Sequence, residues 1–198
     1  LWGESIADGV ETQWSSPRPF DGVDDFGAFW YVPIQNAEMS VNFIIHQGDE
    51  KDPGADQRIV PAQQAHAYIV SGDETIYAQP GAAENVLLLH YRRVDGDYGD
   101  YESDEFDDFW GLHTWGAADD PGWDKPRKAN ADDLFGVIFK VPLTDKAIDL
   151  GYIFHRGDTK DPGPDQFLNV ADWGFEVWQL EAVDPRDPYI LPTQTGQR

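Results

Sequence analysis

The sequence has no cysteine, few cationic residues and no long hydrophobic run. Without cysteine, disulfides, thiol nucleophiles and thiol redox chemistry are excluded. No apolar run approaches the roughly 18 residues of a membrane-spanning helix, and no signal peptide opens the sequence. Only 14 Lys and Arg residues oppose 37 Asp and Glu residues, which gives a formal net charge of −23. Because nucleic acids and anionic membranes bind cationic surfaces, we expect neither as a partner.

Aromatic residues are abundant, with eight tryptophans among 198 residues. Acidic disordered chains are poor in aromatic residues, so this composition indicates a folded protein. The number of indole side chains also exceeds what a core of this size needs.

A segment of the sequence occurs twice, as HQGDEKDPGADQ at His46–Gln57 and HRGDTKDPGPDQ at His155–Gln166. Each copy follows a short apolar run, which predicts a strand that ends in a Gly/Asp/Pro loop. Other residues repeat at the same interval, namely Trp14 with Trp123, Phe26-Gly27 with Phe135-Gly136 and Val32-Pro33 with Val141-Pro142. An internal repeat of this kind predicts two copies of one module, each of roughly 100 residues.

The boundary between the modules is predicted at the Pro/Gly/Ala-rich linker Gln79–Ala83, so the modules comprise residues 1–80 and 81–198. Trp2-Gly3 aligns with Trp115-Gly116. The first module is therefore expected to lack the strand that opens the second.

Short strands separated by turns dominate the predicted secondary structure, and only Asp145–Leu150 has a weak helical pattern. The sequence therefore predicts an all-β protein built of two β-sandwich modules in tandem. The predicted strands are Phe26–Ile34, Met39–Ile45, Ala67–Val70, Thr75–Tyr77, Asn85–Arg93, Phe109–Gly116, Phe135–Val141, Tyr152–Phe154 and Phe175–Leu180. Ser15–Asp25 and the acidic stretch Tyr101–Asp108 are predicted to be loops.

Two rings and one charged pair form the candidate site of the second module. His113 and Trp115 are two residues apart on one predicted strand, so their side chains share a face and can form an aromatic platform. Such a platform suits the C–H face of a sugar ring. In the repeated loop, Lys160 donates hydrogen bonds and Asp165 accepts them, so the pair can bind neighbouring hydroxyls. The corresponding residues of the first module are Trp2, Lys51 and Asp56.

Other interpretations of these residues stand beside the sugar site. A tryptophan in a β-sandwich commonly packs in the core or under a loop, and a lysine among aspartates commonly forms a surface ion pair. The residues assigned to core or loop packing are Trp14, Trp30, Trp110, Trp123, Trp173 and Trp178. An enzyme domain and a calcium-stabilised structural or adhesion repeat are the rival functions. Against them, no HExxH, catalytic triad, phosphate loop or EF-hand pattern is present, so no catalytic residue, cofactor or metal ligand is predicted.

The combined motifs resemble carbohydrate-binding module family 41, the N-terminal modules of bacterial pullulanases. The resemblance is carried by the strand Leu87–Arg93, the segment WGLHTWG at Trp110–Gly116, the repeated loop and the segment FEVWQ at Phe175–Gln179. It implies two immunoglobulin-like β-sandwich modules that bind α-glucans without catalysing a reaction. It also implies stacking by His113 and Trp115, with Lys160 and Asp165 binding hydroxyls, and the same roles for Trp2, Lys51 and Asp56. Some members carry Trp at the position of His113, and an imidazole covers less of a sugar ring.

The same resemblance implies the partners and the location. Pullulan, glycogen, amylopectin fragments and maltooligosaccharides are the expected ligands. The modules are expected to be covalently continuous with a glycoside hydrolase domain that is extracellular or at the cell surface.

Overall fold

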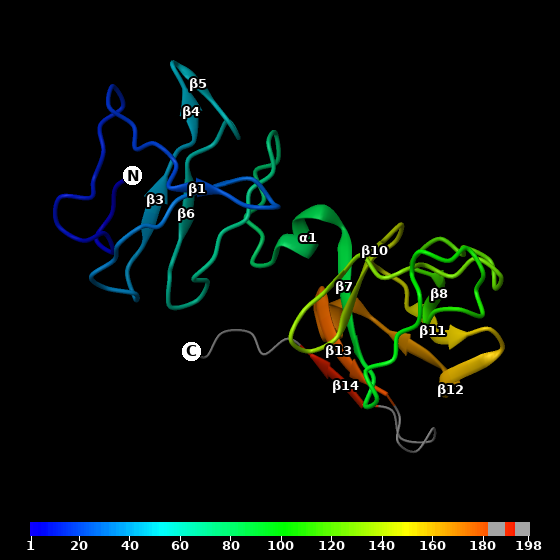
Figure 1. Ribbon diagram of the computed structural model, residues 1–198. Helices are drawn as coiled ribbons and strands as arrows, with labels where there is room; N and C mark the ends of the chain where they lie inside the picture. Colours follow the sequence, from blue (N-terminus) through cyan, green and yellow to red (C-terminus); the bar gives the residue numbers. More distant parts are fainter. Residues whose placement is uncertain (182–188, 193–198) are drawn as a thin grey trace. The chain divides into compact units, whose positions relative to one another are not determined.

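The computed structural model describes residues 1–181 and 189–192. The chain divides into two compact units, Leu1–Ala83 and Glu84–Arg198 (Figure 1). The division falls inside a short helix, α1 (Pro80–Glu84), where Gln79–Ala83 was predicted to be an irregular linker. Nearly all the regular secondary structure is β, as predicted.

The second unit is a sandwich of two sheets (Figure 1). One sheet has the strand order β14-β13-β7-β10-β9 and the other has the order β12-β11-β8. All neighbouring strands are antiparallel except β13 and β7, which are parallel. The strands of this unit are β7 (Val86–Arg92), β8 (Gly111–Gly116), β9 (Ala131–Asp132), β10 (Val137–Pro142), β11 (Leu150–Arg156), β12 (Thr159–Leu168), β13 (Glu176–Leu180) and β14 (Tyr189–Pro192).

Alternate side chains of both sheets form the core of the second unit. Leu87, Leu89 and Tyr91 point inward from β7, as the alternation in that strand predicts. Tyr152 and Phe154 of β11 meet them from the other sheet, and the rings of Tyr91 and Phe154 stack with centroids 4.0 Å apart. Burial of this apolar surface stabilises the sandwich by roughly 25 cal/mol per Å².

The first unit contains three two-stranded sheets and has a thinner core. Its strands are β1 (Gly22–Val23), β2 (Ala28–Phe29), β3 (Val41–Phe43), β4 (His46–Gln47), β5 (Glu50–Lys51) and β6 (Gln57–Ile59). Each pair has the register of its counterpart in the second unit: β1 and β2 pair like β9 and β10, and β3 to β6 pair like β11 and β12. The sequence repeat is therefore also a repeat of strand pairing.

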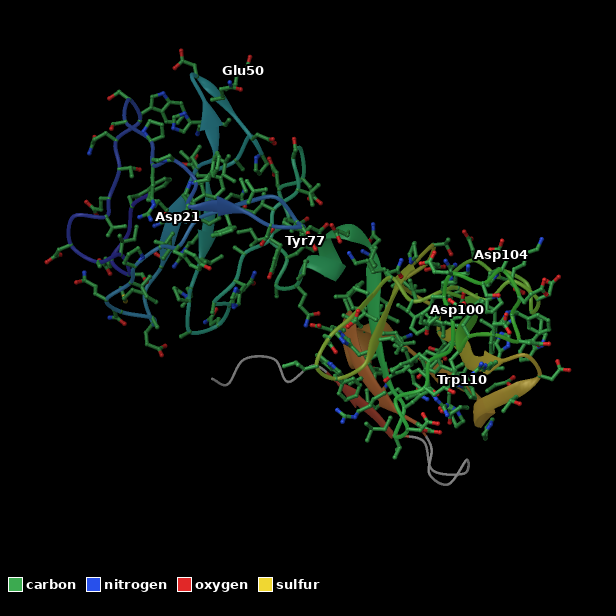
Figure 2. All side chains as sticks on the ribbon, viewed as in Figure 1. Asp21, Glu50, Tyr77, Asp100, Asp104 and Trp110 are labelled. Carbon is green, nitrogen blue, oxygen red and sulfur yellow. The ribbon has the colours of Figure 1, made fainter. Side chains whose placement is uncertain are left out.

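The repeated segment begins with a hairpin in both units, so the predicted turn is present, but paired residues flank it where only turn or loop was expected. In the second unit, β11 continues through His155 and Arg156, and β12 begins at Thr159, so only Gly157 and Asp158 form the turn (Figure 1). Figure 2 shows Glu50 near the tip of the corresponding β4–β5 hairpin. Gly48 and Gly157 have φ values of 60° and 57°, a conformation that glycine adopts at little cost.

Several boundaries differ from the predicted ones. The region Phe26–Ile34 is a strand only at β2, and the predicted loop before it contains β1. The predicted strands near Tyr68 and Tyr77 reduce to a single bridge between these two residues. The weak helical pattern at Asp145–Leu150 gives no helix, whereas Val170–Trp173 forms α2, with Asn169 as its N-cap. In the described part of the chain, no helix is both long enough and apolar enough to span a bilayer.

A buried charged network joins the two sheets of the second unit. Arg93, just after β7, donates to the hydroxyl of Tyr91 at 3.2 Å and lies 3.6 Å from the carboxylate of Asp161 in β12. The Tyr91 hydroxyl donates in turn to Asp161. Arg93 also forms an ion pair with Glu181 at 3.0 Å, and its guanidinium lies 4.1 Å from the centre of the Trp110 ring. Asp161 follows Lys160 directly, so the network also anchors the repeated hairpin to the opposite sheet.

We predict that Arg93→Ala lowers the free energy of unfolding of the second unit by about 3–5 kcal/mol, because it removes the guanidinium from a buried carboxylate. Urea unfolding of the full chain measures this loss. Arg92→Ala is the matched control, since Arg92 is exposed and lies outside the network. Equal stability of the two variants would contradict the assignment.

Candidate functional site

The candidate site of the second unit is the outer face of the sheet β12-β11-β8. Inward residues of β8 and β11 are in the core, so the residues that alternate with them face outward. Strand pairing sets Trp115 beside Gly151, His113 beside Ile153, and His155 beside Lys160. One face therefore collects the ring-bearing residues of β8 and the lysine of the hairpin.

Trp123 and His155 form a stacked pair on this face. Their ring centroids are 3.9 Å apart and the planes differ by 10°. The indole Nε1 donates to Asp158 at 3.2 Å, and the Lys160 ammonium lies 5.4 Å from the Trp123 ring. His155 is 0% exposed, whereas Trp123 is half-buried and covers it. The sequence prediction placed Trp123 in core or loop packing and gave it no part in the site.

The first unit has the same arrangement. Trp14 stacks on His46 at 4.0 Å with a plane angle of 9°, and its Nε1 donates to Asp49 at 3.4 Å. Lys51 lies 5.9 Å from the ring. Trp14 is 43% exposed, so the prediction that it packs in the core or under a loop was wrong. The recurrence of Trp before the hairpin, at the interval of the repeat, was the signal that could have identified both residues.

The lysine and aspartate of each hairpin lie together. Lys51 Nζ is 2.7 Å from Asp56 Oδ1, and Lys160 Nζ is 3.4 Å from Asp165 Oδ1. All four side chains are largely exposed, so an ion pair here adds little stability, under about 1 kcal/mol. The pair therefore sets a donor and an acceptor side by side at the surface, with hydrogen-bonding capacity to spare.

His113 and Trp115 lie side by side but do not form one flat surface. Their ring centroids are 5.7 Å apart and the planes are tilted by 40°. The His113 side chain is only 13% exposed, because the edge of Trp123 packs against it at 5.5 Å. Its Nε2 lies 3.6 Å from Asp120. His113 thus fills the space between two tryptophans, and the exposed aromatic surface belongs to Trp115 and Trp123.

The acidic loop before β8 packs on the tip of the hairpin that carries Lys160. The backbone N–H of Gly157 donates to the carbonyl of Phe106 at 2.9 Å, and Arg156 donates to the carbonyl of Asp107 at 2.9 Å. A Cβ at Gly157 would lie 2.4 Å from Asp107 Oδ1. Other carboxylates of the loop, such as those of Asp100 and Asp104, are exposed (Figure 2). This loop was predicted to be solvated, but its backbone braces the site.

Among residues 1–181 and 189–192, no group of three or more His, Asp or Glu side chains is arranged to hold a metal ion. Charges on the face come instead from single Lys–Asp pairs. The arrangement suits a neutral ligand that offers a flat apolar face and hydroxyl groups at its edge.

Family comparison matches the bacterial pullanase-associated domain twice, at residues 1–78 and 85–185. The chain belongs to this family. It is 37% identical over 145 residues to an alpha-amylase of Streptomyces lividans, an alignment that covers 70% of this chain. The chain spans only 15% of the length of that amylase.

Solved structures with a similar fold are more distant in sequence. A streptococcal virulence factor that binds α-glucan is 18% identical, with a TM-score of 0.47, and the match covers 89% of this chain and 80% of that one. Family 41 carbohydrate-binding modules from streptococcal virulence factors are 18% identical, with a TM-score of 0.44, over 83% of this chain and 75% of theirs. The glycogen-degrading pneumococcal virulence factor SpuA is 17% identical, with a TM-score of 0.46, over 86% of this chain and 17% of that one.

Burial lowers the pKa of His155, and the nearby His113 and Lys160 lower it further, while the hydrogen bond to the carbonyl of Gly157 opposes the change. The unfolded chain therefore takes up this proton at a higher pH than the folded one. The resulting stabilisation is complete above the unfolded-state pKa of about 6.5 and declines as the pH falls toward the folded-state pKa.

We predict that the second unit loses stability between about pH 7 and pH 5, and that His155→Gln reduces this slope. Denaturant unfolding at several pH values measures it. His66→Gln is the matched control, because His66 is exposed in the first unit. A His155 imidazole that titrates at or above about pH 6.5 by NMR would contradict the prediction.

Proposed function

We propose that the chain is a tandem pair of non-catalytic α-glucan-binding modules of carbohydrate-binding module family 41. The observation that carries this proposal is the recurrence of one constellation in both units: an indole stacked on a histidine, next to a Lys–Asp pair. Membership of the pullanase-associated family supports the substrate class. A repeated binding site also gains avidity on a polymer, whereas a repeated catalytic site gains little.

Stacking supplies the apolar half of the proposed interaction. The faces of Trp115 and Trp123 offer rigid, half-buried aromatic surfaces to the C–H groups of consecutive glucose rings. His113 supports both indoles from between. His155 holds Trp123 from beneath, so little conformational entropy is lost when a sugar binds.

Hydrogen bonds supply the polar half. Lys160 donates to one hydroxyl and Asp165 accepts from its neighbour, because each already faces the other across 3.4 Å. In the first unit the corresponding groups are Trp2 and Trp14 for stacking, with Lys51 and Asp56 for hydrogen bonding. A few such contacts predict modest affinity, with Kd of about 10⁻⁴ to 10⁻⁶ M, or about −5.5 to −8 kcal/mol.

The role that follows is to hold an attached catalytic domain on its substrate. Because this chain spans only 15% of that amylase, we propose that it is part of a larger glycoside hydrolase of the pullulanase type. Pullulan, glycogen, amylopectin fragments and maltooligosaccharides are the proposed ligands. In keeping with the pullulanase-type assignment, the modules are proposed to be extracellular or at the cell surface.

We predict that Trp115→Ala abolishes measurable binding of maltotetraose by the second unit. Loss of an aromatic stacking surface costs more than about 1.4 kcal/mol, a factor of about ten in Kd, and the starting affinity is modest. The measurement is calorimetric titration of the full chain, in which Lys51→Ala is also introduced to remove binding by the first unit. Lys160→Ala is expected to weaken binding severely.

Trp178→Ala is the matched control for this experiment, because Trp178 is a half-buried indole on β13 of the other sheet. Unchanged titration in Trp115→Ala would contradict the site. Release of reducing sugar from pullulan by the unmodified chain would instead favour the enzyme alternative.

A second prediction concerns the two sites together. The intact chain should bind glycogen about tenfold or more tighter than a chain with one silenced site, while the affinity of each site for maltotriose stays the same. Native affinity electrophoresis with and without glycogen measures the difference. If glycogen retards the intact chain and the Trp115→Ala, Lys160→Ala variant equally, the two sites give no avidity and that part of the proposal is wrong.

A further inference from the structure

The two sites match closely except in three residues that pair side by side on neighbouring strands. We call these three residues the row. In the second unit, Gly151 of β11 pairs with Trp115 on one side and with Phe167 of β12 on the other. In the first unit, Asn42 of β3 stands between Trp2 and Arg58 in the same register. The row therefore reads Trp–Gly–Phe in one unit and Trp–Asn–Arg in the other.

The indole of Trp115 packs directly on Gly151. A Cβ at this position would lie 2.1 Å from Cε2 and 2.2 Å from Nε1 of the indole, far inside contact distance. These atoms belong to a rigid ring, so the clash could be relieved only by moving the whole indole. Glycine is thus required here by packing, and the indole approaches the strand closely because residue 151 has no side chain.

Phe167 continues the aromatic surface beyond Trp115. Its side chain is 57% exposed, although it is a large apolar group in the middle of a strand pair. Its ring centroid lies 5.9 Å from that of Trp115, with the planes at 88°. The phenyl and indole rings, set nearly perpendicular to each other, make an apolar corner. Phe167 pairs four positions along β11 from the partner of Lys160, a distance of about 13 Å along the sheet.

The first unit cannot form this corner. Asn42 carries a Cβ where Gly151 has none, so Trp2 cannot lie on the strand as Trp115 does. Trp2 is 39% exposed, and among the described residues its ring contacts no other aromatic ring. Asn42 instead donates to the backbone carbonyl of Trp2 at 3.3 Å. Arg58 replaces the apolar wall with a cation.

We propose that Gly151 and Phe167 give the second unit an additional sugar subsite, and that Asn42 and Arg58 remove it from the first. This inference rests on the proposed function. The near-identical hairpins then supply the same hydrogen-bonding Lys–Asp pair in both units. The row determines the affinity of each unit for maltooligosaccharides and the ligand length that it prefers. The second unit binds long maltooligosaccharides tightly, and the first binds weakly and with little dependence on length.

Exchange of the row between units tests the proposal in the full chain. With the first unit silenced by Trp14→Ala and Lys51→Ala, Gly151→Asn should weaken maltoheptaose binding by about tenfold or more. Phe167→Ala should weaken maltoheptaose binding severalfold and leave maltotriose binding nearly unchanged. A structural defect would weaken both ligands alike, so the dependence on chain length distinguishes a subsite from a folding effect.

The reverse exchange keeps the test sharp if Gly151→Asn does not fold. With the second unit silenced by Trp115→Ala and Lys160→Ala, the double variant Asn42→Gly, Arg58→Phe should tighten maltoheptaose binding about tenfold. Misfolding cannot produce a gain of affinity. Leu134→Ala is the matched control for Phe167→Ala, since Leu134 is fully exposed between β9 and β10 of the other sheet.

The failure of this inference differs from the failure of the proposed function. If neither exchange changes affinity or length dependence while Trp115→Ala still abolishes binding, Gly151 and Phe167 form no additional subsite and the site stands. If the unmodified chain binds neither maltoheptaose nor glycogen, the proposed function is wrong and this inference with it.

Discussion

Strand β11 serves the core with one face and the candidate site with the other. Its inward residues, Tyr152 and Phe154, are fully buried against the opposite sheet. The residues that alternate with them face outward, where Trp115 packs on Gly151 and His155 supports Trp123. Because the period of a strand is two, a slip of one residue in its pairing would turn the core residues outward and destroy both surfaces. Stability and the site therefore depend on one register.

The histidine of the repeat illustrates how the site is held rigid. A buried imidazole normally needs partners for both nitrogens, and His155 satisfies Nδ1 with the carbonyl of Gly157 while its Nε2 has no hydrogen-bond partner among the described residues. Burial that lowers its pKa keeps the ring neutral at pH 7, which suits close stacking beneath an indole. The stacking contact with Trp123 offsets the hydrogen bond that Nε2 of His155 does not make. Rigidity of this kind reduces the entropy cost of ligand binding.

Some of this architecture follows from the sequence, and some does not. The strands β7 and β13 were predicted because their alternation is local. The repeated segment was assigned to a turn or loop because Pro, Gly and Asp are turn residues, yet pairing across the two-residue turn, as between His155 and Lys160, extends both strands into it. Neither Trp14 nor Trp123 was assigned to the site, because a single indole carries no sign of whether it will pack inward or stack on an exposed hairpin; only its recurrence at the interval of the repeat marked both positions. Lys160 and Asp165 were expected to act together, and on β12, where the pairing is irregular between Asp161 and Gln166, they lie 3.4 Å apart.

Charge supplies the last constraint on what the site can select. With a net charge of −23, the surface repels polyanions over the range of the Debye length, about 8 Å at physiological ionic strength. One lysine per hairpin, already paired with an aspartate, is too little positive charge to overcome that field. A neutral glucan encounters no such barrier, because its recognition uses C–H surface and hydroxyls. The acidic surface thus disfavours anionic glycans without any specific contact, while the aromatic residues discriminate among the neutral ones.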